Sequence, residues 1–171
     1  MCPPEIRTLH AEVNTMYLNC PGSEPIRPRQ EPDVALNAST GGAGPLPIIT
    51  TLLADPISIV STTIDVSEMS NPSVLLNFTG IISLPVGIAV TLNFQLNRST
   101  DDGASRVGGT YTFSTLVTVL ESESFTFQFF DADIEPDVYT YQVQLSTNSI
   151  IDVTPGLTIL NATLSALAVN R

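Results

Sequence analysis

The stretch ESFTFQFFDADIEPDVYTYQVQLS, residues 123–146, decides the fold class of this chain. Apolar residues alternate with polar ones on both sides of an acidic break. The alternating apolar residues are Phe125, Phe127, Phe129, Tyr139, Tyr141, Val143 and Leu145. Successive side chains of a strand point to opposite faces, so the pattern predicts two antiparallel strands, each with one face in a core and one in solvent. We interpret the break, DADIEPD, as a solvated hairpin that joins them.

The same β pattern runs through the chain from residue 48 onward. Apolar runs occur in IITTLL, ISIVSTTIDV, SVLLNFTGII, VGIAVTLNFQLNR, GGTYTFSTLVTVL and GLTILNATLSALAV, separated by turn formers such as Asn71-Pro72 and Asp101-Asp102-Gly103. About eight to ten strands without helices predict an all-β fold, a jelly-roll-like antiparallel β-sandwich. An immunoglobulin-type sandwich is the alternative, although the chain has no Trp and the body has no cysteine pair.

The first 47 residues differ in composition from the rest. They hold most of the thirteen prolines and the glycine-rich segment STGGAGPLP, residues 39–47. Proline removes a backbone donor and fixes φ, so this region is a poor strand former. We predict three parts: an N-terminal connector at 1–20, called the leader below, a Pro/Gly-rich linker at 21–47, and the sandwich domain at 48–171.

The leader carries a modest apolar stripe that needs a cover. Ile6, Leu9, Val13 and Tyr17 have helical spacing, whereas the alternation between Leu9 and Tyr17 fits a strand equally well. Such a segment can add to an open sheet edge or fill a groove on a neighbouring subunit, as in donor-strand complementation. Head-to-tail docking propagates into a filament. These four residues are therefore our inter-subunit docking candidates.

Both cysteines, Cys2 and Cys20, lie in the leader. A bond between them within one chain would close a loop of about 19 residues and stabilise it by roughly 3 kcal/mol. Free thiols are a second alternative. Bonds to neighbouring subunits are a third, and they would lock an assembly in an oxidising exterior. The two residues are therefore candidates for inter-subunit disulfides.

The charge balance excludes several partners. The chain has 17 acidic residues, six arginines and no lysine, for a net charge of −11. Binding to nucleic acid or to anionic membrane needs clustered basic residues, so neither is expected. No basic segment followed by an apolar run opens the chain, and no run reaches the roughly 18 apolar residues of a membrane span. We expect no membrane insertion and an extracellular, spore-surface or cell-surface location without a recognisable signal peptide.

Glycosylation would depend on a secretory route. Asn-x-Ser/Thr sequons occur at Asn37, Asn77, Asn97 and Asn161.

Catalysis is not expected, and neither is a cofactor. The single histidine, His10, lies in the leader, so the body has no histidine or lysine to activate a nucleophile. Glu121 and Glu123 are a possible carboxylate pair, which we interpret as a solvated edge. No nucleotide-binding motif or cysteine–histidine metal-binding spacing occurs. We predict a protein that is not an enzyme.

The acidic break is a weak calcium candidate. Asp131, Asp133, Glu135 and Asp137 occupy alternate positions, and carboxylates of one loop can converge on a calcium ion. The segment lacks the glycine and the terminal glutamate of an EF-hand loop. The alternative is a solvated connection whose charges keep two aromatic-rich strands soluble.

The layout of the chain resembles a set of spore-surface proteins. A Cys- and Pro-bearing leader, MCPPEIRTLHAEVNTMYLNCPG, precedes a Ser/Thr-rich body that includes PSVLLNFTGIISLPVGIAVTLNFQLNRSTDDG and ends in LTILNATLSALAVN. This arrangement is similar to the sandwich proteins of the spore surface in endospore-forming Firmicutes, and more loosely to endospore appendage subunits, which pair a jelly roll with an N-terminal connector. The resemblance implies a fibre subunit in which Cys2 and Cys20 bridge to other subunits. This chain departs from the appendage subunits in two respects. Appendage connectors tend to be shorter and carry adjacent cysteines, whereas Cys2 and Cys20 lie 18 positions apart. Appendage bodies often carry acceptor cysteines, whereas the body of this chain has none.

We therefore expect a structural subunit that polymerises with copies of itself through its leader into an extracellular or spore-surface fibre. Two other functions stay open. One is a non-catalytic adhesin or carbohydrate-binding sandwich module. The other is a capsid or decoration jelly roll.

Overall fold

The computed structural model describes residues 33–46, 56–84, 88–117, 121–146 and 156–171. In these residues the chain forms eight β-strands. They are β1 (Val34–Ala43), β2 (Ile57–Asp65), β3 (Pro72–Leu84), β4 (Ile88–Thr100), β5 (Gly103–Val117), β6 (Glu121–Asp131), β7 (Val138–Ser146) and β8 (Thr158–Asn170). Within the described ranges there is no helix of the length and apolar character needed to cross a membrane.

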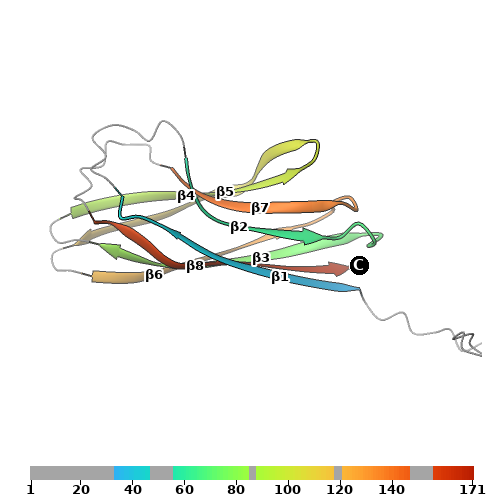
Figure 1. Cartoon of the computed structure of the whole chain (residues 1–171), viewed down its shortest axis with the longest axis horizontal. Helices are drawn as coiled ribbons and strands as arrows, with labels where there is room; N and C mark the ends of the chain where they lie inside the picture. Colours follow the sequence, from blue (N-terminus) through green and yellow to red (C-terminus); the bar gives the residue numbers. More distant parts are fainter. Residues whose placement is uncertain (1–32, 47–55, 85–87, 118–120, 147–155) are drawn as a thin grey trace, which may run out of the picture. The chain divides into compact units, whose positions relative to one another are not determined.

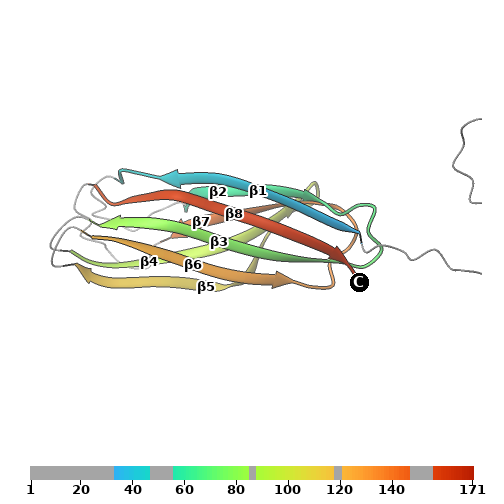
Figure 2. The same cartoon turned by 90° about the horizontal axis from the view of Figure 1, so that it is seen from below.

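The strands form two four-stranded antiparallel sheets, with the orders β1-β8-β3-β6 and β2-β7-β4-β5. Figure 1 shows the sheets as two layers, and Figure 2 looks onto the first of them. β1 pairs with β8, β2 with β7, β3 with β6 and β4 with β5. The first strand thus pairs with the last, the second with the second to last, and so on to the central pair. Such nested pairs form one long antiparallel ribbon that folds over into two sheets, and this topology is a jelly roll. The predicted fold class is confirmed.

The core lies between the sheets and follows the predicted alternation. Tyr139, Tyr141, Val143 and Leu145 of β7 are buried, as the sequence pattern predicts. Aromatic rings fill the centre, with the Phe78 ring centroid 4.9 Å from that of Phe127 on the neighbouring strand. Burial of the alternate apolar side chains on both inner faces is the main stabilising contribution to such a sandwich.

The acidic break is not a hairpin, and that interpretation is wrong. β6 pairs with β3 in the first sheet, whereas β7 pairs with β2 and β4 in the second. The segment between them therefore crosses from one sheet to the other. Alternation predicts that each strand has an apolar face but does not predict which strand it pairs with. In a sandwich, two consecutive strands can belong to opposite sheets and still bury their apolar faces in the same core.

The linker prediction is wrong for the residues of β1. Val34–Ala43 is a strand paired along β8, and so the sandwich begins before residue 48. Pro32 and Pro45 flank this strand and none lies within it. Gly41 allows β1 to approach β2 closely, because a Cβ at this position would clash with the carbonyl oxygen of Ile59 on β2. The remainder of the predicted linker, and the leader, lie outside the described residues.

The turn predicted at Asp101-Asp102-Gly103 is confirmed. It is a tight connection between β4 and β5, in which Thr100 pairs with Gly103. Gly103 has a φ of 146°, which side-chain-bearing residues rarely adopt.

Candidate functional site

Four large apolar side chains form a line across the outer face of the first sheet. Leu36 of β1 pairs with Leu167 of β8, Leu167 with Leu75 of β3, and Leu75 with Phe130 of β6. Residues directly opposite each other in antiparallel strands share a face, so the four side chains stand side by side. We call Leu36, Leu167, Leu75 and Phe130 the apolar row. Figure 2 shows the four strands that it crosses.

The apolar row faces outward. Leu36 is 71% exposed and Phe130 45% exposed, while Leu75 and Leu167 are each 37% exposed. The inward neighbours, such as Leu76 and Ala166, are fully buried. The apolar row is therefore separate from the hydrophobic core and lies on the opposite face of the sheet.

The whole outer face around the row lacks charge. Two residues along each strand from the row stand Ala38, Ser165, Asn77 and Gln128, and two further along stands a line of threonines. The threonines are Thr40, Thr163, Thr79 and Thr126. Among the described residues, the remaining outward positions of the four strands also carry neither Asp, Glu nor Arg. The guanidinium of Arg171 lies at the rim, 4.7 Å from the centre of the Phe130 ring.

The outer face of the second sheet has a different character. Asn97 donates through Nδ2 to Oε1 of Gln144 at 2.7 Å, and Gln144 donates through Nε2 to Oε1 of Gln142 at 2.6 Å. Gln142 then donates through Nε2 to the hydroxyl of Ser58 at 2.9 Å. This face is a network of amides and hydroxyls that bond to one another. Among the side chains of this face that the structure describes, no row of apolar residues crosses the strands.

Nine of the eleven acidic residues that the structure describes gather at the end of the sandwich that holds the C terminus, whereas Glu121 and Glu123 lie at the start of β6 (Figure 1). The nine lie before β1, at the ends of β2 and β6, and in the β2–β3, β4–β5 and β6–β7 connections. They are Asp33, Asp65, Glu68, Asp101, Asp102, Asp131, Asp133, Glu135 and Asp137. The charge of the body is thus displaced from the sheet faces to one end.

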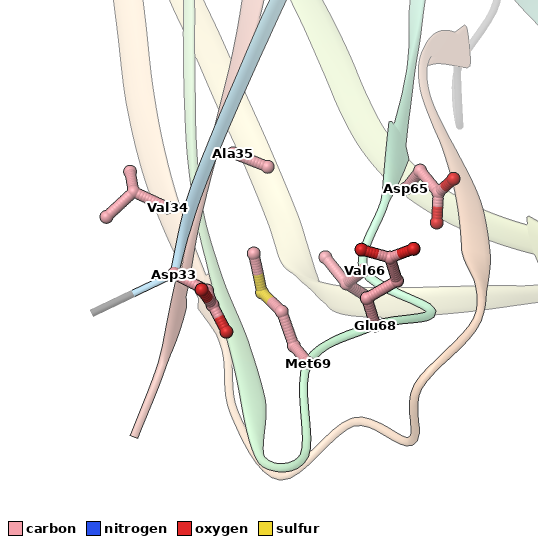
Figure 3. A pocket seen from close by; sticks show the side chains of 7 residues that line it. All are labelled: Asp33, Val34, Ala35, Asp65, Val66, Glu68 and Met69. Carbon is pink, nitrogen blue, oxygen red and sulfur yellow. The ribbon is translucent and has the colours of Figure 1, made fainter. Parts of the chain in front are cut away.

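A hollow of about 370 Å³ lies at this acidic end (Figure 3). Figure 3 shows Met69 in its floor, with Asp33 on one side and Asp65 and Glu68 on the other. The backbone N–H and the hydroxyl of Ser67 both donate to Oδ1 of Asp65, and this lowers the pKa of that carboxyl.

The four calcium candidates do not form one site. The Asp131 carboxylate is buried and accepts bonds from Arg98 at 3.0 Å and from the Tyr141 hydroxyl at 2.8 Å. Asp137 uses its carboxylate on the N–H of Val138, at 2.7 Å. Asp133 and Glu135 are exposed. Across the part of the chain that the structure describes, no three His, Cys, Asp or Glu side chains are placed to hold a metal ion.

The other sequence-based candidates have mixed outcomes. The docking and disulfide candidates, Ile6, Leu9, Val13, Tyr17, Cys2 and Cys20, lie outside the described residues, as does His10. Glu123 accepts a bond from the hydroxyl of Thr115 at 3.4 Å. Of the sequons, Asn37 donates to the carbonyl oxygen of Thr63 at 2.6 Å, so its amide nitrogen is engaged, as is that of Asn97. Asn77 is partly buried, whereas Asn161 is exposed.

The apolar row is the feature that the sequence patterns did not predict. A signal for it exists in the doublets Leu75-Leu76 and Phe129-Phe130. Adjacent residues of a strand point to opposite faces, so an apolar doublet places one large side chain outside the core.

The fold and surface define a class of protein: an eight-stranded jelly-roll sandwich with an acidic end and an uncharged outer face on one sheet. The chain belongs to the family described as domain of unknown function DUF4489, whose profile matches residues 34–169. That match includes β1. Among curated proteins none matches the chain.

Several solved viral structures are similar in arrangement at low identity. A structure of infectious bursal disease virus, Gx strain, is 12% identical with a TM-score of 0.44, covering 86% of this chain and 36% of that one. The Gt strain structure is 12% identical with a TM-score of 0.46, covering 87% and 42%. A structure of the T13 viral particle is 10% identical with a TM-score of 0.37, covering 87% and 39%. This chain therefore spans about two fifths of the viral chains it matches.

Proposed function

We propose that this chain is a structural subunit that assembles with copies of itself, through its leader, into an extracellular or spore-surface fibre. The observation that supports this is the apolar row on an uncharged sheet face. An isolated body gains nothing from exposing three leucines and a phenylalanine side by side, and apolar patches of this kind mark contact surfaces.

The distribution of charge is consistent with repeated contacts between identical chains. Copies of a chain with a net charge of −11 repel one another, and the cost is largest where acidic groups meet. Contacts between proteins are depleted of charged residues at their centre. An uncharged face can be covered while the acidic end stays in solvent and keeps the assembly soluble.

In this proposal the leader makes the joint and the function is structural, not catalytic. The leader docks on a neighbouring copy in the manner of a donated strand or helix, and Cys2 and Cys20 reinforce the joint as disulfides between leaders. The chain needs no cofactor, nucleic acid or membrane for this role.

Negative-stain electron microscopy of the purified full chain tests assembly. We expect fibres from the full chain, and only dispersed particles from a variant that lacks residues 1–20. Circular dichroism serves as the control, because the truncated variant retains every described strand and should keep the same β spectrum and melting temperature. Fibres formed equally well without the leader would overturn the proposal.

Reductant tests the disulfide part of the proposal. We expect dithiothreitol, or replacement of both cysteines by serine, to make the fibres dissociate at lower denaturant concentration. Antibody labelling of intact cells or spores of the producing organism tests location. Label confined to lysed cells would contradict the surface assignment.

The amide and hydroxyl network on the second sheet favours one other function, carbohydrate binding. Amide groups such as Gln142 and Gln144 can exchange their bonds to each other for bonds to sugar hydroxyls. A glycan array probed with the full chain tests this, and Gln142→Ala should then abolish the signal without changing the fibres.

A further inference from the structure

We propose that the apolar row is the docking site for the leader of a neighbouring copy, whose Ile6, Leu9, Val13 and Tyr17 cover it. This inference rests on the proposed function and names the surface that receives the leader. Three properties of the row support it: its position, its size and the charges around it.

The position of the row leaves it open to another segment of the chain. Leu36 lies three residues after Asp33, where the described body begins, and its side chain is 71% exposed. Thirty-two residues precede that point in the sequence. They include the leader, which has an apolar stripe of its own to bury.

The row and the stripe match in length. The row crosses four neighbouring strands, so it extends over three strand spacings, about 14 Å. In the helical alternative, the stripe from Ile6 to Tyr17 spans 12 residues, which is a rise of about 17 Å. A helix laid along the row would therefore place its four apolar side chains against the four of the row. Burial of these apolar side chains would supply the hydrophobic contribution that drives most protein association.

Charge favours the leader over a second body as the occupant. The row lies close to the acidic end, where Asp33 precedes Leu36 by three residues, although the Arg171 guanidinium lies over the Phe130 ring. Two bodies packed row against row would bring their acidic ends toward each other, and like charges repel where salt does not screen them. The leader carries only Glu5, Glu12 and Arg7, so it brings little charge to the contact.

Disulfide trapping between two forms of the full chain tests the proposal directly. One form carries Cys2→Ser, Cys20→Ser and Ala38→Cys, which places a thiol on β1 beside the row. The other form keeps its native cysteines and carries a size tag. After mixing and mild oxidation, we expect a mixed dimer on a non-reducing gel. The matched control replaces Ala38→Cys by Ser61→Cys, an exposed position on the outer face of the second sheet.

The trapping experiment has outcomes that overturn the proposal. Equal dimer yield from the two positions means that the leader does not select the row. A chain with native cysteines and Ala38→Cys that closes only within itself means that the leader covers its own body. A dimer between two Ala38→Cys forms, with no leader cysteine, means that the row packs against a second body.

A substitution in the row separates this proposal from the proposed function. We expect Leu36→Ser to abolish fibres, or to lower the assembled fraction at least tenfold, with an unchanged melting temperature. Leu160→Ser is the control, because Leu160 is 48% exposed on the same sheet but outside the row. If deletion of residues 1–20 abolishes fibres and Leu36→Ser does not, the leader docks elsewhere, such as at an open strand edge, and only this inference fails. If the deletion leaves fibres intact, the proposed function fails.

Discussion

Nη1 of Arg98 lies 3.0 Å from Oδ2 of Asp131, and this ion pair joins the two sheets at the acidic end of the sandwich. Arg98 comes from β4 of the second sheet and Asp131 from the last position of β6 in the first. The same carboxylate oxygen accepts the hydroxyl of Tyr141 at 2.8 Å. The Arg98 guanidinium also lies 5.4 Å from the centre of the Tyr139 ring. The Asp131 carboxylate thus anchors the start of the β6–β7 connection to the second sheet through Arg98 and Tyr141.

Replacing Asp131 by Asn should destabilise the body strongly. The change leaves the Arg98 charge without its partner, and because the ion pair is partly buried we expect a cost of up to about 3 kcal/mol. For a chain of this size that corresponds to a fall in melting temperature of roughly 6–12 °C. Asp133→Asn is the matched control, because it is the same chemical change two residues away at an exposed side chain. Thermal unfolding curves that shift equally for both variants would contradict the role given to the ion pair.

Tyr141 should make stability sensitive to alkaline pH. Burial, with the nearby Asp131 charge, raises the pKa of the Tyr141 hydroxyl well above its usual value. Stability from this group is therefore fully present below the unfolded pKa of about 10 and lost as pH rises above it, by about 1.4 kcal/mol per pH unit. Urea unfolding between pH 8 and 11 should show this decline.

The Tyr141→Phe variant isolates that contribution. At pH 8 it should be less stable by about 1 kcal/mol, because it loses the bond to Asp131. Above pH 10 its stability should fall less steeply than that of the native chain. Burial also raises the pKa of Tyr139 and of Tyr111, so some alkaline decline should remain. Parallel pH profiles for the two chains would show that Tyr141 does not titrate as expected.

The inner faces of the sandwich could be predicted from the sequence, whereas the outer surface could not. Alternation identifies the buried residues of β7 because burial imposes a period of two on a strand with one wet face. The apolar row depends on register between strands that are far apart in the sequence, and no local pattern encodes which residues of β1, β8, β3 and β6 come to lie opposite one another.

β1 shows the limit of local patterns most clearly. Its alternating apolar residues, Val34 and Leu36, point outward, while Ala35 packs against the core. The pattern is thus inverted relative to the other strands. This inverted pattern, together with Gly41 and Gly42, makes the sequence of β1 similar in composition to a linker. The core does not explain a strand that exposes its larger apolar residues, whereas the proposed docking on the apolar row would explain it.

Thr62→Val should stabilise the body. Thr62 is 2% exposed, and its hydroxyl finds no hydrogen-bond partner among the described residues. Valine has nearly the same shape and buries no polar group, so we expect a gain of about 1 kcal/mol in the free energy of unfolding. The control is Thr63→Val on the same strand, whose hydroxyl lies 2.8 Å from that of Thr140 and is exposed. Chemical denaturation of the two variants measures the difference. A loss of stability in Thr62→Val would show that the hydroxyl is satisfied.

Gly41→Ala tests whether β1 is an integral strand of the body. The new Cβ would lie 2.3 Å from the carbonyl oxygen of Ile59 and 3.1 Å from the Cβ of Val60, so β1 and β2 would have to separate. Overpacking of this kind costs about 1–3 kcal/mol, which lowers the melting temperature by roughly 2–12 °C. Gly109→Ala is the control, because no heavy atom lies within 4 Å of its Cβ, and we expect a change within about 0.5 kcal/mol. A linker would tolerate both substitutions equally, so matching melting curves would remove β1 from the sandwich and, with it, Leu36 from the apolar row.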